Sequence, residues 1–380
     1  MPTAATNGRT SNVGEPSVAI SGDRILATGN WYAARSLTGG TSWQYLDPDT
    51  YLLPQPPTRY CCDQTAIYVP SRDLIVYLLQ YRQSAGGNTL RLAVSRGATL
   101  EDADWVWWDL TPAGVNASWS NEWFDYNHAA LSDNYLYVGS NLFTLDSEVW
   151  TRSIVMRFPL DELATADELS FDYVESLENG SLRCTTGASS VMYVVGQNAN
   201  LRQLRVYSWP ETGAVTQRDI DVSPWRIGSY VSVGPDGTNW LGRCDDRITG
   251  AWVGGGAIGV LWSANKVGSK RPRPYIRAVL IEETAMSVAA EPDIWSSSRA
   301  YAYPDAHPND DGTVGVTLFR GGGSRNPGHA VGIFEEPGRT WRLRVAVDGT
   351  HGPGDDTWGD YFACRKAAPN GSRWFATGFT

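Results

Sequence analysis

Apolar residues along this chain occur in many short runs. The runs predict β-strands, and we expect only one helix. The clearest runs are rich in Val, Ile, Leu, Tyr and Phe and occupy residues 74–81, 135–140, 191–195, 259–262 and 314–319. Further runs follow them at residues 90–95, 153–158, 203–209 and 275–281. Clusters of Gly, Asn, Asp and Pro separate the runs, which is typical of β-strands joined by turns. We expect one short surface helix around residues 160–169.

A longer period is visible in the segments that pass from polar residues into an apolar strand. Such segments occur at residues 14–20, 61–67, 125–130, 183–188, 243–248, 303–307 and 358–363. Successive starts are roughly 60 residues apart, which is a spacing typical of β-propeller blades with long loops. The pattern predicts an all-β, seven-bladed β-propeller, with six blades as the alternative, built by residues 1–380 as a single domain. Because the last segment is short, we expect the residues before Gly14 to complete the last blade.

The composition agrees with short strands and excludes two classes of partner. The chain has 39 Gly, 21 Pro, 17 Trp and 18 Tyr, and 19% of its residues are charged. Its formal net charge of −10 argues against nucleic-acid and anionic-membrane partners, because both need a basic face. No apolar run approaches the roughly 18 residues of a membrane-spanning helix. We therefore expect neither a nucleic-acid nor a membrane partner. We also expect a monomer.

The N-terminus, the N-glycosylation sequons and the cysteines are the features that concern secretion. No signal peptide is visible in the polar residues 1–13, so we expect a secreted protein whose signal peptide is absent from this sequence. Three N-x-S sequons, at Asn116, Asn179 and Asn370, fit an exported chain. The five cysteines have no zinc-site spacing. Cys61 and Cys62 are adjacent, and two alternatives stay open for them, a vicinal disulfide or two packed thiols.

One turn motif carries a family resemblance. Residues 36–43 read Ser-Leu-Thr-Gly-Gly-Thr-Ser-Trp and resemble the Asp-box (BNR-type) turn of sialidase-like β-propellers, Ser-x-Asp-x-Gly-x-Thr-Trp. Thr38 stands in place of the Asp, and Phe334–Trp341 is a second degenerate copy. The resemblance implies the fold, with a structural role for the turn. The Arg-Ile-Pro motif of true sialidases is absent from the sequence, so we expect a sialidase-like propeller that is not a sialidase.

Candidate site residues follow from the propeller geometry. The innermost strand of each blade lines a central channel, so we expect the openings of these strands to meet in one funnel. The catalytic candidates are Asp63, Asp125, Tyr126, His128 and Arg247. The substrate-binding candidates are Glu15, Arg183, Arg243, Asp245, Tyr303, His307, Trp358, Asp360 and Tyr361. Each has a competing structural interpretation, because Asp and Arg at strand starts also join neighbouring blades.

These residue types favour a carbohydrate-active enzyme, a polysaccharide lyase or a glycoside hydrolase. A lyase needs a base at C5 of a uronate, for which His128 with Tyr126 is the candidate, and a cation for the carboxylate. A hydrolase needs two carboxylates, ~5 Å apart for retention or ~6.5–9.5 Å apart for inversion. The alternatives are a non-catalytic glycan-binding propeller and a cyclase-type enzyme acting on an apolar metabolite. We expect a carbohydrate or small-molecule ligand and no metal or other cofactor, with Ca²⁺ in the channel as an open alternative.

Overall fold

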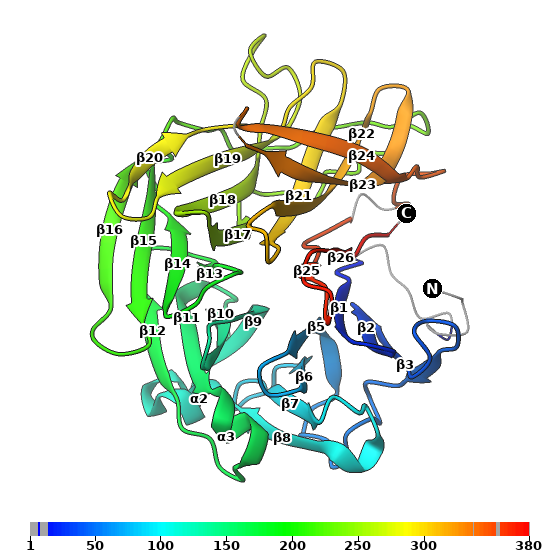
Figure 1. Cartoon of the computed structure of the whole chain (residues 1–380), viewed down its shortest axis with the longest axis vertical. Coiled ribbons are helices and arrows are strands. Elements are labelled where there is room, and N and C mark those ends of the chain that lie inside the picture. Colours follow the sequence, from blue (N-terminus) through cyan, green and yellow to red (C-terminus); the bar gives the residue numbers. More distant parts are fainter. Residues whose placement is uncertain (1–6, 8–13, 337, 355–357, 380) are drawn as a thin grey trace. The chain divides into compact units, whose positions relative to one another are not determined.

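The computed structural model describes residue 7 and residues 14–336, 338–354 and 358–379. These residues form six four-stranded antiparallel sheets and one two-stranded sheet (Figure 1). In each four-stranded sheet the strands are hydrogen-bonded in chain order, which is the up-and-down arrangement of a propeller blade. The described chain therefore has six propeller blades, and the prediction of seven was wrong. No described helix is long and apolar enough to cross a membrane.

The chain divides into two compact units, which are described one at a time. Unit 1 is Met1–Ser11 with Glu15–Leu182, and unit 2 is Asn12–Gly14 with Arg183–Thr380. The first blade of unit 1 consists of β1 (Ser17–Ser21), β2 (Arg24–Gly29), β3 (Tyr32–Ser36) and β4 (Gln44–Leu46). The second consists of β5 (Tyr60–Val69), β6 (Leu74–Tyr81), β7 (Leu90–Arg96) and β8 (Trp105–Leu110). The third consists of β9 (Glu122–Leu131), β10 (Tyr135–Thr144), β11 (Trp150–Pro159) and β12 (Asp172–Ser176).

Unit 2 contains the other blades and the two-stranded sheet. The fourth blade consists of β13 (Arg183–Cys184), β14 (Val191–Gln197), β15 (Gln203–Pro210) and β16 (Thr216–Asp221). The fifth consists of β17 (Ile248–Gly254), β18 (Ala257–Ala264), β19 (Tyr275–Glu282) and β20 (Ser287–Ala290). The sixth consists of β21 (Ala300–Pro308), β22 (Val314–Gly322), β23 (Arg325–Glu335) and β24 (Thr340–Val347). The two-stranded sheet pairs β25 (Cys364–Lys366) with β26 (Trp374–Ala376).

Short helical turns complete the described secondary structure. They are η1 (Asp102–Asp104), α2 (Pro112–Val115), η2 (Ala117–Trp119) and α3 (Leu160–Thr165). The helix expected around residues 160–169 is therefore confirmed as α3. Thr111 begins α2, because its side chain accepts a hydrogen bond from the backbone N–H of Gly114.

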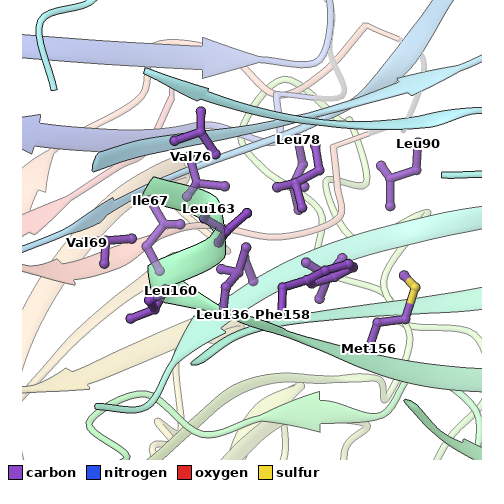
Figure 2. Close-up of a cluster of buried hydrophobic side chains, with 14 of the residues drawn as sticks. Ile67, Val69, Val76, Leu78, Leu90, Leu136, Met156, Phe158, Leu160 and Leu163 are labelled. Carbon is purple, nitrogen blue, oxygen red and sulfur yellow. The ribbon is translucent and has the colours of Figure 1, made fainter. Parts of the chain in front are cut away.

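The apolar runs found in the sequence become the middle strands of the blades. Every residue of β6 is buried, because neighbouring strands and packed layers cover both of its faces. Figure 2 shows the resulting core in unit 1, where Ile67 of β5 and Leu136 of β10 lie in the same cluster as Phe158 of β11. Leu160 and Leu163 of α3 belong to this cluster, so the short helix buries apolar side chains of its own.

The seventh polar-to-apolar segment does not begin a four-stranded blade. Residues 358–363 are not in a strand, and they lead into β25, which pairs with β26 alone. The backbone N–H of Cys364 donates to Asp305 at 2.8 Å, which joins β25 to β21 of the sixth blade. The seven-blade prediction failed because the same polar-to-apolar transition also precedes a hairpin. The expectation that residues before Gly14 complete the last blade falls almost wholly outside the described residues.

Side chains of the turn at residues 36–43 form hydrogen bonds with the backbone of the same turn. Residues 37–43 connect β3 to β4. The hydroxyl of Thr38 accepts a hydrogen bond from the backbone N–H of Ser42 at 2.9 Å, and Trp43 Nε1 donates to the carbonyl of Gly40 at 3.0 Å. Side chains of the turn therefore satisfy its own backbone groups, which fixes the reversal between the two outer strands.

Candidate functional site

The predicted site residues are distributed over both units. Unit 1 contains Glu15, Asp63, Asp125, Tyr126 and His128. Unit 2 contains Arg183, Arg243, Asp245, Arg247, Tyr303, His307, Trp358, Asp360 and Tyr361. Within unit 2, the structure brings four of these side chains, Arg243, Asp245, Arg247 and Asp360, into one group, which we call the open cluster.

Arg247 is the centre of the open cluster. Its Nε donates to Oδ2 of Asp245 at 2.6 Å, and its Nη2 lies 3.3 Å from Oδ2 of Asp360. Nη2 of Arg243 approaches the same Asp360 oxygen at 3.8 Å. The side chains of Arg243 and Asp245 are 47% and 45% exposed, so solvent and solutes reach the cluster. One guanidinium group therefore contacts two carboxylates at an accessible surface.

The local backbone explains why these side chains meet. Residues 243–247 lie in the segment before β17, where the Oδ1 of Asp245 accepts the backbone N–H of Arg247 at 2.9 Å. Such an Asx-type turn reverses the chain over two residues and brings the two side chains together. Asp246, between them, accepts instead from Trp225 Nε1 at 2.8 Å. The turn thus sends consecutive carboxylates to different partners.

Aromatic residues hold the segment that carries Asp360. The hydroxyl of Tyr303 donates to the backbone carbonyl of Trp358 at 2.8 Å, and the Trp358 ring stacks on Phe319 at 4.6 Å between centroids. Burial raises the pKa of Tyr303 well above its usual value, so its hydroxyl stays protonated as a donor. Tyr303 occupies a bulge of β21 with a positive φ of 55°, which is uncommon for an aromatic residue. These two predicted residues therefore position Asp360.

The two carboxylates of the open cluster have different surroundings. Although 45% of the Asp245 side chain is exposed, loss of hydration by the surrounding protein raises its pKa; Arg247 opposes the rise, and the charges of Asp360 and Asp246 add to it. Such a carboxyl holds its proton to a higher pH than an ordinary aspartate, which suits a proton donor. Oδ1 of Asp360 is buried and has no hydrogen-bond partner among the described residues. A buried carboxylate oxygen without a partner costs stability, and such groups are concentrated at functional sites.

A second group in unit 2, which we call the closed cluster, consists of Arg183, Asp305 and Arg365. Asp305 is fully buried, with Oδ1 3.3 Å from Nη2 of Arg183 and Oδ2 3.1 Å from Nη1 of Arg365. The same Oδ2 accepts the backbone N–H of Cys364. Burial lowers the pKa of the Arg365 guanidinium. These contacts tie β13, β21 and β25 together, so Arg183 has a structural environment rather than an open one.

The remaining unit 2 candidates, His307 and Tyr361, lie outside the open cluster's ion pairs. Nδ1 of His307 lies 2.6 Å from the carbonyl oxygen of Pro308, so this nitrogen is the donor. Loss of hydration lowers the pKa of His307 to about 4, which leaves the ring neutral at neutral pH. Tyr361 is buried. The substrate-binding roles of both residues stay predictions.

In unit 1, the predicted residues lie in hydrogen-bonded or packed positions. Asp125 accepts from Gln80 Nε2 at 2.9 Å, and Glu15 accepts from Asn30 Nδ2 at 2.8 Å. Tyr126 and His128 are both buried, and a Cβ on Gly139 would lie 2.0 Å from the His128 ring, so this ring is in close contact with the glycine. The catalytic roles of these residues stay predictions.

The vicinal cysteines are joined. Cys61 and Cys62 form a disulfide in β5, within the same irregular stretch between Tyr60 and Gln64 that contains Asp63. Of the two alternatives that the sequence left open, the disulfide is the one that the structure contains. Among the described residues, no three His, Cys, Asp or Glu side chains are grouped so that they could hold a metal ion.

Sequence reasoning missed Arg365 and the contacts of both Asp245 and Asp360 with Arg247. Arg365 lies in β25, directly after a segment that was expected to be an innermost strand. The innermost strands β5, β9, β17 and β21 each have a register shift near the predicted starts. A bulge changes which way the following side chains point, so simple alternation could not place them. The Asp-x-Arg spacing of the turn at 245–247 was the one available signal.

Comparisons with known proteins give structural neighbours but no family. No family model and no curated protein matches the chain. The β-propeller domain of the trilobed protease from Pyrococcus furiosus is 11% identical, with 93% of this chain and 88% of that chain covered and a TM-score of 0.46. A Trypanosoma rangeli sialidase is 11% identical, with 84% and 55% covered and a TM-score of 0.45, so this chain spans about half its length.

A third neighbour is the hemagglutinin-neuraminidase ectodomain of parainfluenza virus 5, at 12% identity, with 92% and 83% covered and a TM-score of 0.43. The neighbours thus include sialidases and neuraminidases together with other propeller proteins. At these identities and TM-scores they assign neither the Asp-box family nor an activity to this chain.

Proposed function

We propose that the open cluster is the active site of a glycoside hydrolase that acts on acidic glycans. The observation that carries the proposal is the pair Asp245 and Asp360, which contact one guanidinium group and have different environments. Glycoside hydrolysis uses two carboxyl groups about 5–9.5 Å apart, one that donates a proton and one that is ionised. Carboxylates that share the Arg247 guanidinium are close enough to flank one glycosidic bond.

Each residue of the cluster has a role in the proposed reaction. Asp245, whose pKa is raised, donates its proton to the leaving oxygen as the bond between that oxygen and the anomeric carbon breaks. A water molecule then adds its hydroxyl group to the anomeric carbon and returns its proton to Asp245. Asp360 supplies the carboxylate that faces the positive charge developing at the anomeric carbon. Arg247 is a positioning residue, because it contacts both carboxylates. Arg243, nearly half exposed and 3.8 Å from Asp360, is available to bind a carboxylate of the substrate.

The hydrolase is preferred to the other reactions by accessibility and charge. The base predicted for a lyase, His128, is buried against Gly139, whereas Asp245 is accessible. A cyclase acting on an apolar metabolite needs an apolar site, whereas the open cluster consists of four charged side chains. Glycan binding without turnover uses the same surface, and the test below separates it from hydrolysis.

The test is a screen of the whole chain against uronate-bearing and sulfated polysaccharides, with neutral polysaccharides for comparison. Hydrolysis produces new reducing ends without absorbance from unsaturated uronates, and Asp245→Asn and Asp360→Asn should abolish it. Asp348→Asn is the matched control, because Asp348 also lies between two arginines, 2.9 Å from Arg320 and 3.8 Å from Arg325, but is 53% exposed. Unsaturated products would indicate a lyase instead, and binding without any product would indicate a glycan-binding propeller.

A further inference from the structure

The loop between β18 and β19 of unit 2 is strongly basic in an acidic protein. Residues 265–274 include Lys266, Lys270, Arg271 and Arg273 and no acidic residue, whereas the whole chain has a formal net charge of −10. Val267 and Arg271 exchange backbone hydrogen bonds of 2.7 and 3.2 Å, which makes the loop a tight hairpin. The fold therefore concentrates positive charge on one short, hydrogen-bonded loop.

This loop forms one wall of a pocket of about 460 Å³. The pocket is lined by Arg226, Ile227, Asn265, Lys266, Gly268 and Pro272. Asn265 ties the two walls together, since its backbone N–H donates to the carbonyl of Arg226 at 2.8 Å and its Nδ2 donates to the carbonyl of Ser229 at 3.0 Å. The volume of the pocket is within the range of about 300–1,000 Å³ that is typical of ligand pockets.

Four of the five cations on the pocket lining and the loop lack acidic partners among the described residues. In the part of the chain that the structure describes, none of Arg226, Lys266, Lys270 and Arg273 forms an ion pair, and all four side chains are exposed. Arg271 differs, because it pairs with Asp293 at 3.1 Å and lies 4.5 Å from the ring centroid of Trp295. Arg271 therefore anchors the loop, and the four unpaired cations, of which Arg226 and Lys266 line the pocket, are left for an external anion.

The surroundings of the pocket favour a sugar polymer among the possible polyanions. Ile227 in the pocket and Trp295 beside Arg271 are exposed, and such apolar faces pack well against sugar rings. The net charge of −10 disfavours nucleic acids and anionic membranes, which present dense negative charge over a wide area. A single flexible polysaccharide chain needs only the small basic area that this loop supplies.

We infer that this pocket is a second binding site, where unpaired cations hold the carboxylate or sulfate groups of an acidic polysaccharide. The site lies in the same unit as the open cluster, and its purpose, to retain a polymer during hydrolysis, rests on the proposed function. The binding itself does not depend on turnover. The chemical class of the ligand is an anionic glycan with several charged groups.

The test compares two charge-matched double variants of the full chain. Arg226→Gln with Lys266→Gln removes two cations at the pocket, and Arg342→Gln with Arg344→Gln removes two from β24 of another sheet. The probe is polygalacturonate, with dextran as the neutral comparison. We expect the pocket variant to bind polygalacturonate about tenfold more weakly or worse, with a flatter salt dependence, and the β24 variant to stay within about twofold. Dextran should not bind.

Several outcomes would overturn the inference. These are equal losses in the two double variants, equal binding of dextran, or tighter binding of duplex DNA or phosphatidylserine vesicles than of polygalacturonate. Turnover of a short soluble acidic glycoside should be unchanged in the pocket variant, because the open cluster is intact. If no glycan is hydrolysed by the wild-type chain, the proposed function fails, whereas a selective loss of polygalacturonate binding would still support the pocket.

Discussion

Asp305 and Asp360 of unit 2 each lie between two arginines, and their surroundings differ. Asp305, in the closed cluster, has no exposed surface and accepts from Arg183, Arg365 and a backbone N–H. Asp360, in the open cluster, contacts Arg247 and Arg243 at 3.3 and 3.8 Å, and its Oδ1 has no partner among the described residues. Identical residue types thus build a joint between strands in one place and an accessible charged site in the other.

The difference shows what decides the role of an ion pair in this fold. Removing charges from water is costly, so a buried group such as the closed cluster persists only when it is well hydrogen-bonded. The arginine side chains of the open cluster are more exposed than those of the closed cluster. Arg243 and Arg247 are 47% and 28% exposed, whereas Arg183 and Arg365 are 9% and 13% exposed. An exposed arginine can exchange its protein partner for a ligand at low cost, because water already solvates the arginine and the carboxylate that it leaves. Exposure and incomplete hydrogen bonding therefore identify the functional group better than residue type does.

The largest expected effect is on turnover by the open cluster. Asp245→Asn removes the proton donor and should lower kcat on an acidic polysaccharide by roughly 10²–10⁴-fold. The free energy of unfolding should change by less than about 1 kcal/mol, because Asp245 is half exposed. Reducing-end assays and urea titrations measure the two quantities, and Asp348→Asn should leave both close to wild type. Turnover preserved in Asp245→Asn would contradict its role.

A substitution in the closed cluster should lower the free energy of unfolding. Asp305→Asn removes a charge that pairs with two guanidinium groups in the interior, and it should lower the free energy of unfolding by about 3–5 kcal/mol. Urea titration measures this loss. Asp348→Asn, at an exposed site between two arginines, should cost less than about 1 kcal/mol. Equal losses in these two variants would show that burial does not separate the clusters.

A smaller effect is expected from the arginines. Arg243→Gln should raise KM for an acidic polysaccharide about tenfold, with kcat nearly unchanged, because a charge-assisted contact to the bound substrate is lost in the ground state and the transition state alike. Arg183→Gln should instead lower the free energy of unfolding, since Arg183 is buried against Asp305. A fall in kcat at constant KM in Arg243→Gln would place Arg243 in the reaction itself.

The smallest effect concerns pH. The raised pKa of Asp245 should make kcat/KM fall as the pH rises through that pKa, because only the protonated carboxyl donates. Loss of hydration by the surrounding protein is the main cause of the rise, and the charge of Asp246 is a minor one. Asp246→Asn should therefore move the falling limb of the pH profile slightly to lower pH, and Asp348→Asn should not move it. A shift to higher pH would contradict this account.

The positions of the strands could be predicted from the sequence. The number of blades and the contacts within the candidate site could not. Runs such as residues 74–81 were identified because both faces of β6 are covered, so every position is apolar or aromatic apart from Gln80. The blade count failed at residues 358–363, where a polar-to-apolar transition leads into a hairpin. The members of the open cluster were each predicted. Their contacts depend on the turn at Asp245 and on the placement of a non-strand segment, and neither follows from periodicity.

The most direct test measures unfolding and turnover on the same preparations of Asp305→Asn and Asp360→Asn. Both substitutions remove one carboxylate from between two arginines in unit 2. We predict that Asp360→Asn unfolds at nearly the wild-type urea concentration and hydrolyses no acidic polysaccharide, and that Asp305→Asn unfolds at a much lower concentration. An Asp360→Asn protein that hydrolyses at the wild-type rate, or that is destabilised as much as Asp305→Asn, would contradict the assignment of the open cluster as the functional site.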